Sequence, residues 1–64
     1  MINLSAKELD IIRMIADGRT SVQIAEKMNL SLPTIKWYRK RIKAKIGAAT
    51  TVEVIRRAIE QNII

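Results

Sequence analysis

Apolar residues recur at helical intervals in four stretches of the 64-residue chain, and residues suited to helix ends separate the stretches. A side chain returns to the same face of an α-helix after three or four residues, so each stretch predicts a helix with one apolar side. The predicted helices cover residues 6–17, 20–28, 32–46 and 51–62. We see no strand pattern, internal repeat, low-complexity segment or linker. The pattern therefore predicts a single all-α domain of four helices over residues 1–64.

The expected helix ends carry capping residues. Three pairs have the spacing of a capping box, in which a hydroxyl and a side-chain carbonyl or carboxylate each bind a free backbone amide: Ser5 and Glu8, Thr20 and Gln23, Thr50 and Glu53. Ser31 can cap the third helix, and Pro33 is tolerated in its first turn, where amides are unpaired anyway. Gly18, Asn29 and Gly47 stand where a left-handed residue would end a helix.

The apolar stripes predict which faces form the core. In chain order they contain Leu9, Ile11, Ile12, Met14, Ile15 and Ala16; Ile24, Ala25 and Met28; Ile35, Ile42 and Ile46, with Tyr38 beside them; and Val52, Ile55, Ala58 and Ile59. The last helix has a second, weaker stripe of Val54, Arg57, Ala58 and Gln61. Two interpretations of this second stripe stay open, a dimer interface with another subunit or a loosely covered terminal helix.

The third predicted helix is strongly basic. Between residues 36 and 45 it has six positive charges and no acidic residue, namely Lys36, Arg39, Lys40, Arg41, Lys43 and Lys45. Exposed helices usually mix acidic and basic residues, because opposite charges four residues apart stabilise the helix. Here like charges at that spacing repel. A solvated charged face is the simpler alternative, but such repulsion favours a helix that meets a polyanion.

The composition narrows the function. The formal net charge is +6, and most of the excess lies in residues 31–64, which favours an anionic partner. The chain has no cysteine and no histidine, so it lacks the usual zinc ligands and the usual general base. It also lacks a glycine-rich phosphate loop and a clear carboxylate pair. We therefore expect no enzyme activity, no metal, no cofactor and no small-molecule ligand. No apolar run is long enough to span a bilayer and no signal peptide is visible, so we expect a cytoplasmic protein.

The second and third predicted helices form a helix-turn-helix pattern. A short helix, a turn over residues 29–31 and a longer basic helix follow one another, and in such motifs the second helix reads the major groove. Lys36 and Lys40 lie one turn apart on the outer side, within reach of guanine O6 and N7. Trp37 offers an apolar surface to a thymine methyl group or a sugar, although packing against the preceding helix is its alternative role. We therefore predict that Lys36, Trp37 and Lys40 read bases.

A second group of residues is expected at DNA phosphates. Four basic residues lie towards the margins of the third helix, and the start of the second helix presents amides and the positive end of a helix dipole. These candidates are Arg39, Arg41, Lys43 and Lys45, with Thr20 and Ser21. Their contribution should be independent of sequence and sensitive to salt.

Several fragments of the chain, in their order and spacing, support one family resemblance. They are Leu4-Ser5-x-x-Glu8, Ala16-x-Gly18, Ile24-Ala25, Leu30-Ser31-x-x-Thr34-Ile35-Lys36 and Lys45-Ile46-Gly47. From about residue 4 to residue 64 the chain resembles the LuxR-type (GerE/NarL/FixJ-like) helix-turn-helix domain of bacterial transcription regulators. The resemblance implies four helices with the third as reader, and a homodimer formed largely through the fourth helix. It also implies the C-terminal effector domain of a longer regulator, such as the output domain of a two-component response regulator.

The resemblance also assigns roles to individual positions. Positions that match the family's base-reading residues are Lys36, Trp37 and Lys40, and those that match its phosphate-binding residues are Thr20, Thr34 and Lys43. Glu8 matches an acidic residue that the family uses structurally, often to hold a basic partner near the start of the last helix. The family usually has arginine at the position of Thr51, so this pairing should be lost or replaced. Tyr38 stands where the family most often has histidine, and Trp37 is bulky for a groove-facing position. These departures leave the fold intact, but the family's sequence preference does not carry over to this chain.

Rival functions stay open at this point. The promoter-reading fourth region of a sigma factor shares much of this pattern, and binding to core RNA polymerase would distinguish it. A protein-interaction adaptor that has lost DNA binding is another class, which the unbroken basic helix disfavours. A basic amphipathic helix can also lie on anionic lipid, but three separately capped helices around one core argue against a membrane-surface peptide. Because one small reader offers few base contacts, useful specificity suggests two copies on half-sites about one helical turn apart.

Overall fold

The computed structural model describes residues 3–64, and within them it contains four α-helices and no strand. They are α1 (Ala6–Ala16), α2 (Ser21–Met28), α3 (Leu32–Ile46) and α4 (Thr51–Glu60). The predicted all-α class is confirmed, and the predicted boundaries agree to within two residues. Residues 1 and 2 of the predicted domain lie outside the described part of the chain.

Two complete capping boxes start α1 and α2, as predicted. The Ser5 hydroxyl accepts from the Glu8 amide at 3.2 Å, and the Ser5 amide donates to Glu8 Oε1 at 2.8 Å. The corresponding distances for Thr20 and Gln23 are 3.2 Å and 2.9 Å. These hydrogen bonds satisfy amides that the first turn of a helix leaves without an intrahelical partner.

The cap of α4 differs from the prediction. Thr50 Oγ1 accepts from the Glu53 amide at 3.2 Å, which is the expected half of a capping box. The Glu53 carboxylate, however, accepts from the amide of Ala49 at 3.3 Å instead of that of Thr50. The extended backbone of Thr50, with φ −132°, places the preceding amide within reach of the carboxylate.

Left-handed residues end or follow the helices. Gly18, Asn29 and Gly47 have φ of +84°, +57° and +76°, which confirms all three predicted positions. Asn62 also has a positive φ of +56°, and Ile63 donates its amide to the Ala58 carbonyl at 2.8 Å. This turn ends α4 two residues before the predicted end.

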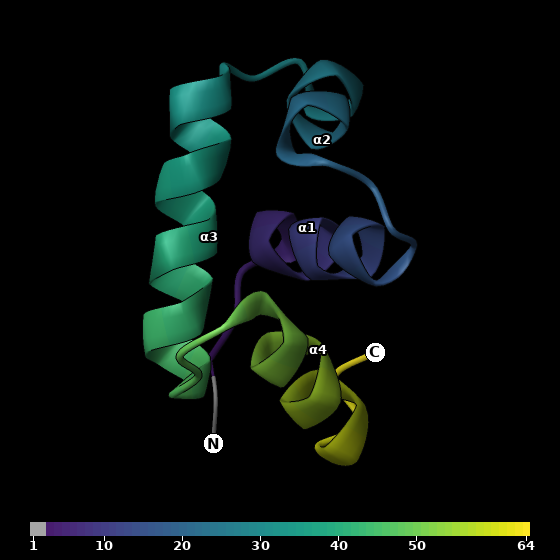
Figure 1. Cartoon of the computed structure of the whole chain (residues 1–64), viewed down its shortest axis with the longest axis vertical. Helices are drawn as coiled ribbons and strands as arrows, with labels where there is room; N and C mark the ends of the chain where they lie inside the picture. Colours follow the sequence, from purple (N-terminus) through teal and green to yellow (C-terminus); the bar gives the residue numbers. More distant parts are fainter. Residues whose placement is uncertain (1–2) are drawn as a thin grey trace.

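The helices pack on one side of α3. Figure 1 shows α3 along one edge of the molecule, with α2, α1 and α4 stacked beside it and α1 in the middle. Contacts join α3 to each of the other three helices, and join α1 to α4. The short turn between α2 and α3 confirms the helix-turn-helix arrangement. The opposite side of α3 is left uncovered by the other helices (Figure 1).

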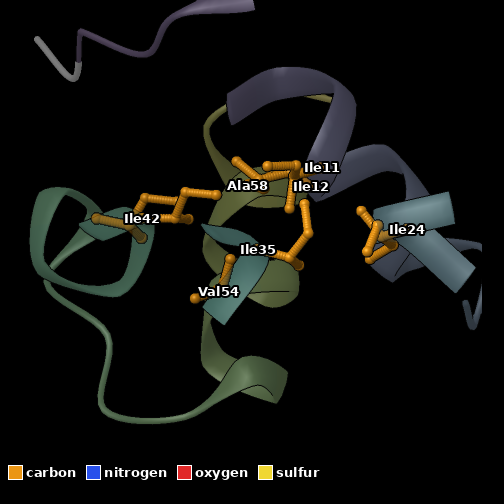
Figure 2. Close-up of a cluster of buried hydrophobic side chains, with 9 residues drawn as sticks. Ile11, Ile12, Ile24, Ile35, Ile42, Val54 and Ala58 are labelled. Atoms are coloured by element: carbon orange, nitrogen blue, oxygen red, sulfur yellow. The ribbon is translucent and has the colours of Figure 1, made fainter. Parts of the chain in front are cut away.

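The core is made mostly of isoleucine. Ile11 and Ile12 of α1, Ile24 of α2, and Ile35 and Ile42 of α3 are completely or almost completely buried, and Figure 2 shows them converging. Branched side chains of one size from three helices form a single close-packed cluster. Each contributes roughly 1.5–3 kcal/mol of burial free energy, which a domain this small needs.

The predicted inner face of α4 is only partly correct. Ala58 lies in the core and the half-buried Ile55 packs against it, as predicted, but Val52 and Ile59 do not. Val52 and Ile59 are 78% and 58% exposed, whereas Val54 and Ala58 are 2% and 0% exposed and belong to the core. Both sides of α4 carry apolar residues, so periodicity alone does not identify the side that meets the core. The small side chains of Val54 and Ala58 allow α4 to approach α1 and α3 closely.

The side of α4 that meets the core also corrects the predicted dimer interface, which was the stripe of Val54, Arg57, Ala58 and Gln61. Val54 and Ala58 are covered by the protein's own helices and are not available to a partner, so their assignment to a dimer interface is wrong. Arg57 is half-buried, and Gln61 is the one residue of the four that is exposed.

We expect Ile42→Val to lower the free energy of unfolding by about 0.5–1.5 kcal/mol, because it removes one methyl group from a close-packed core. Val52→Ala removes apolar volume from a highly exposed position of α4 and should change stability by less than about 0.5 kcal/mol. Urea denaturation followed by circular dichroism measures both. A larger loss for Val52→Ala than for Ile42→Val would contradict the observed orientation of α4, in which Val52 faces solvent.

Candidate nucleic-acid interface

The uncovered side of α3 carries the residues predicted to read bases. Lys36, Trp37 and Lys40 are all exposed, and the small residue Ala44 continues the same face. Ile35 and Ile42, on the other side of the helix, anchor α3 in the core. The structure therefore brings the three predicted base-reading residues together on one solvent-facing surface, which we call the reading face (Lys36, Trp37, Lys40 and Ala44).

Trp37 is held by neighbours on its own helix. Its ring contacts Tyr38 edge to face, with centroids 5.0 Å apart and planes inclined at 74°. The guanidinium of Arg41 lies 5.3 Å from the centroid of the indole, within the range of a cation–π interaction. Trp37 remains 54% exposed, which favours a groove-facing position over packing beneath α2.

Three lysines of α3 have no acidic partner within residues 3–64. The ion pairs found there join other residues, and none includes Lys36, Lys40 or Lys43. Lys43 is half-buried on the flank of the helix, next to the reading face. Because these charges are not neutralised internally, they remain available to an external polyanion.

Arg39 has a structural position that the sequence pattern did not predict. Its Nη1 donates to Ser21 Oγ and its Nη2 donates to Thr51 Oγ1, both at 2.9 Å. Ser21 and Thr51 are the first residues of α2 and α4, so one guanidinium joins three helices. The predicted phosphate contacts of Arg39 and Ser21 stay predictions, but the groups concerned already bind one another. The only sign of this role in the sequence is the spacing of Arg39 from the isoleucines of α3, which places it on the flank of the helix.

Glu8 is the single charged residue among the buried side chains of residues 3–64, with 1% exposure. Its Oε1 accepts from Lys45 Nζ at 2.8 Å as well as from the Ser5 amide, and its Oε2 lies 3.5 Å from Arg41 Nε. The family pairing that Thr51 disrupts is therefore replaced by two basic residues of α3. Oε2 itself is buried without a hydrogen bond.

Lys45 is engaged away from the reading face. Besides Glu8, its ammonium group donates to the backbone carbonyl of Asn3 at 3.2 Å. These two contacts fasten the start of α1 and the residues before it to the last turn of α3. The phosphate contact predicted for Lys45 is untested, and its side chain in this structure reaches towards α1 instead.

Opposing effects determine the pKa of Glu8. Burial alone raises the pKa of this carboxyl, but hydrogen bonds from Lys45 and Ser5, with the charge of Lys45, outweigh burial. The net pKa is lowered from the ordinary value of 4.5. Glu8 is therefore an ionised carboxylate near neutral pH, and its charge is compensated by α3.

The remaining phosphate candidates already have local partners. The Thr20 amide and hydroxyl take part in the capping box of α2, and Thr20 is exposed. Thr34 is half-buried, and its hydroxyl lies 2.8 Å from Ser31 Oγ. Thr20 caps the start of α2 and Thr34 lies in the first turn of α3. The phosphate contacts of both residues stay predictions.

A separate apolar surface lies away from the reading face. Side chains of α1 and α4 line a shallow depression that contains Ile15, Ala16, Thr51, Val52, Ile55, Arg56 and Ile59. Three of these residues, Val52, Ile55 and Ile59, belong to the α4 stripe that was expected to face the core. We call this surface the α1/α4 apolar surface.

Within residues 3–64, no helix is both long and apolar enough to cross a membrane. The same part of the chain contains no cluster of three or more acidic residues, cysteines or histidines that could hold a metal ion.

The fold and the reading face define a class of protein. A helix-turn-helix unit whose second helix exposes unpaired lysines is a nucleic-acid-binding module of the kind found in transcription regulators. The chain belongs to the luxR family of bacterial regulatory proteins, because the model of that family matches residues 2–58. The resemblance inferred from the sequence fragments is confirmed.

Similar proteins support this placement. The chain is 36% identical over 61 residues to the transcriptional regulatory protein MctR of Rhizobium johnstonii, covering 95% of this chain and 28% of MctR. It is 40% identical over 55 residues to the HTH-type transcriptional activator RamA of Corynebacterium glutamicum, covering 86% of this chain and 20% of RamA. The crystal structure of the response regulator ChrA of a heme-sensing two-component system superimposes with a TM-score of 0.93. That comparison has 31% identity and covers 97% of this chain and 31% of ChrA.

The chain spans less than a third of the length of each of these three relatives. The chain therefore matches only part of each of them. Family membership identifies this chain with DNA-binding transcription regulation, and the parts of the relatives that it does not match say nothing about its own signal.

We expect the free energy of unfolding to depend on Glu8 through pH. Since its pKa is lowered in the folded protein, the ionised carboxylate stabilises the fold above its ordinary pKa of 4.5. That contribution should be lost as the pH falls through the lower, folded-state value. Urea denaturation of the wild type and of Glu8→Gln, at several pH values from 7 to 2, measures it. The wild type should be more stable at neutral pH and the difference should shrink in acid, whereas a constant difference would contradict the assignment.

Proposed function

We propose that this domain binds double-stranded DNA sequence-specifically, with α3 in the major groove, and thereby regulates bacterial transcription. The single observation that carries the proposal is the reading face. Lys36 and Lys40 stand one turn apart, exposed and without acidic partners in the described chain, on a helix whose other side is fixed in the core. A helix that reads a groove must be uncovered on one side, basic there and fixed to the rest of the domain, and α3 has this arrangement.

The proposed roles divide by position on α3. Lys36 and Lys40 donate to guanine O6 and N7, and Trp37 presents its apolar ring to a thymine methyl group or a sugar. Lys43, on the flank, contacts a phosphate and contributes binding that is independent of sequence. Ala44 has a small side chain, so the groove floor can approach this turn of the helix closely.

We extend the proposal to a homodimer that binds two half-sites about one helical turn apart. The supporting observation is the α1/α4 apolar surface, where Val52 and Ile59 are exposed although both are apolar. This surface takes the place of the buried stripe first assigned to the interface. The proposed interface is still on α4, but on a different side of that helix from the stripe first assigned to it.

Several broader features follow from this proposal. The domain acts as the DNA-binding output part of a longer regulator, in the cytoplasm at the bacterial chromosome, with RNA polymerase as a candidate partner at promoters. Response regulators such as ChrA contain a similar domain, which supports a role in two-component signalling. The proposed work is binding, not catalysis.

Selection from a pool of random DNA duplexes, repeated at two salt concentrations, tests the proposal. Enrichment of a short motif, in pairs with fixed spacing, is the expected result. Salt-sensitive binding without enrichment would contradict sequence-specific reading, and no binding at all would favour the protein-interaction adaptor. Binding to core RNA polymerase without DNA would favour the sigma-like alternative.

We expect Lys36→Ala and Lys40→Ala each to cost about 1–3 kcal/mol of binding free energy on the selected site, and to relax its base preference. The physical reason is the loss of a donor that faces base edges. Fluorescence anisotropy titrations with selected and random duplexes measure the effect. An equal loss on both duplexes would remove the base-reading role.

Lys43→Ala is the matched contrast on the same helix. It should weaken binding to selected and random duplexes alike and reduce the slope of log affinity against log salt by about one unit. An unchanged slope would show that Lys43 does not contact a phosphate.

We expect Ile59→Glu to abolish dimer formation on paired half-sites while leaving single half-site binding intact. A carboxylate in an apolar interface stays desolvated without a partner, whereas on the free monomer it is exposed to water. Sedimentation velocity with a duplex carrying two half-sites measures the stoichiometry. Gln61→Glu adds the same charge outside the α1/α4 apolar surface, and it should leave the stoichiometry unchanged. Two bound copies of Ile59→Glu would place the interface elsewhere.

A further inference from the structure

Arg41 lies between a buried carboxylate and the most exposed aromatic ring of the chain. Its Nε is 3.5 Å from Glu8 Oε2, and its guanidinium is 5.3 Å from the centre of the Trp37 indole. Glu8 belongs to the core side of α1, and Trp37 belongs to the reading face. A continuous row of contacts therefore runs from the interior of the domain to the surface proposed to meet bases.

The inner end of this row is rigid. Glu8 is buried, and its Oε1 is held at 2.8 Å by both the Ser5 amide and Lys45 Nζ. With Oε1 fixed by two donors, the direction of Oε2 is fixed as well. Oε2 has no hydrogen bond of its own, so Arg41 is the cation that compensates this oxygen.

The outer end of the row would otherwise be free. The Arg41 side chain is half-exposed, and an arginine at such a position normally samples many rotamers. Trp37 precedes Arg41 by four residues, so the two side chains lie on one flank of α3. A planar guanidinium can face a carboxylate with its edge while its plane lies against a ring. Attraction to Glu8 thus places the guanidinium where it limits the orientations of the indole.

We propose that Glu8 and Arg41 are positioning residues for Trp37, which they hold in one orientation on the reading face so that it discriminates between bases. The inference deepens the proposed function and rests on it, because it assumes that Trp37 meets DNA. It also assigns Arg41 a role different from the phosphate contact expected from the sequence. Specificity of the reader would then depend on a residue of α1 that never touches DNA.

The orientation of Trp37 can be measured without DNA. Trp37 is the only tryptophan of the chain, so its indole N–H gives one resonance in a nitrogen-15 correlation spectrum. In the wild type we expect its heteronuclear NOE to approach that of the α3 backbone amides. Glu8→Gln and Arg41→Gln should both lower it and shift the resonance. The control is Asp10→Asn, which removes an acidic residue from the exposed side of α1, the helix of Glu8. Asp10 pairs there with Arg13 at 3.8 Å, and its replacement should change neither the NOE nor the resonance of the indole.

DNA binding supplies the second readout. Glu8→Gln should reduce the ratio of selected to random duplex affinity by about fivefold, the lower end of what one base contact provides, with little change on random duplex. Arg41→Lys keeps the charge but loses the planar group, so it should lower the same ratio. If Arg41→Lys keeps the ratio while Arg41→Gln weakens both duplexes equally, Arg41 is a phosphate contact and the inference fails.

Two controls keep the test decisive. Glu8→Gln removes two ion pairs, so the folded fraction is checked by circular dichroism, and Arg41→Gln serves as a second variant in which Glu8 keeps Lys45. An unchanged indole signal in both folded variants would overturn the inference even if the wild type reads DNA as proposed. If instead the wild type shows no preferred site but the indole loosens in both variants, the proposed function fails while the contact row holds.

Discussion

The burial of three isoleucines on one side of α3 is the constraint on which the rest of the structure depends. Ile35, Ile42 and Ile46 are packed against the other helices, although α3 carries six positive charges along its length and no acidic residue. Like charges four residues apart destabilise an isolated helix by a few tenths of a kcal/mol per pair. Core burial outweighs that repulsion by a wide margin. The protein can therefore present concentrated positive charge because the same helix is anchored from behind.

Contacts within the domain then divide these charges into two groups. Lys45 and Arg41 turn towards Glu8, and Arg39 turns towards the first residues of α2 and α4. Lys36, Lys40 and Lys43 have no such partner in the described chain. Three of the six basic residues of α3 thus stabilise the arrangement of helices, and the other three are left for a partner outside the molecule.

Local features were predictable from the sequence, and features that depend on relative helix rotation were not. The caps at Ser5 and Thr20 and the left-handed positions at Asn29 and Gly47 depend on residues within one turn of each other. They were predicted correctly. The exposed side of α3 was also predictable, because its two faces differ sharply in polarity. On α4 both faces are apolar, and which of Val52 and Val54 is buried depends on how closely the helix approaches α1 and α3. The long side chains of Arg39 and Lys45 reach helices distant in sequence, so no spacing along the chain reveals their partners.

The hydrogen bonds from Arg39 to Ser21 and Thr51 limit how far the domain can change shape when it binds. By joining the beginnings of α2 and α4 to the middle of α3, they oppose any change in the angle between the two helices of the DNA-binding motif. On the proposed function, the motif would meet its target as a rigid body and would lose little conformational entropy on binding. Adjustment to an imperfect site would fall to the bending and groove width of the DNA. Base pairs that the protein never touches would then contribute to the choice of site through the stiffness of the duplex.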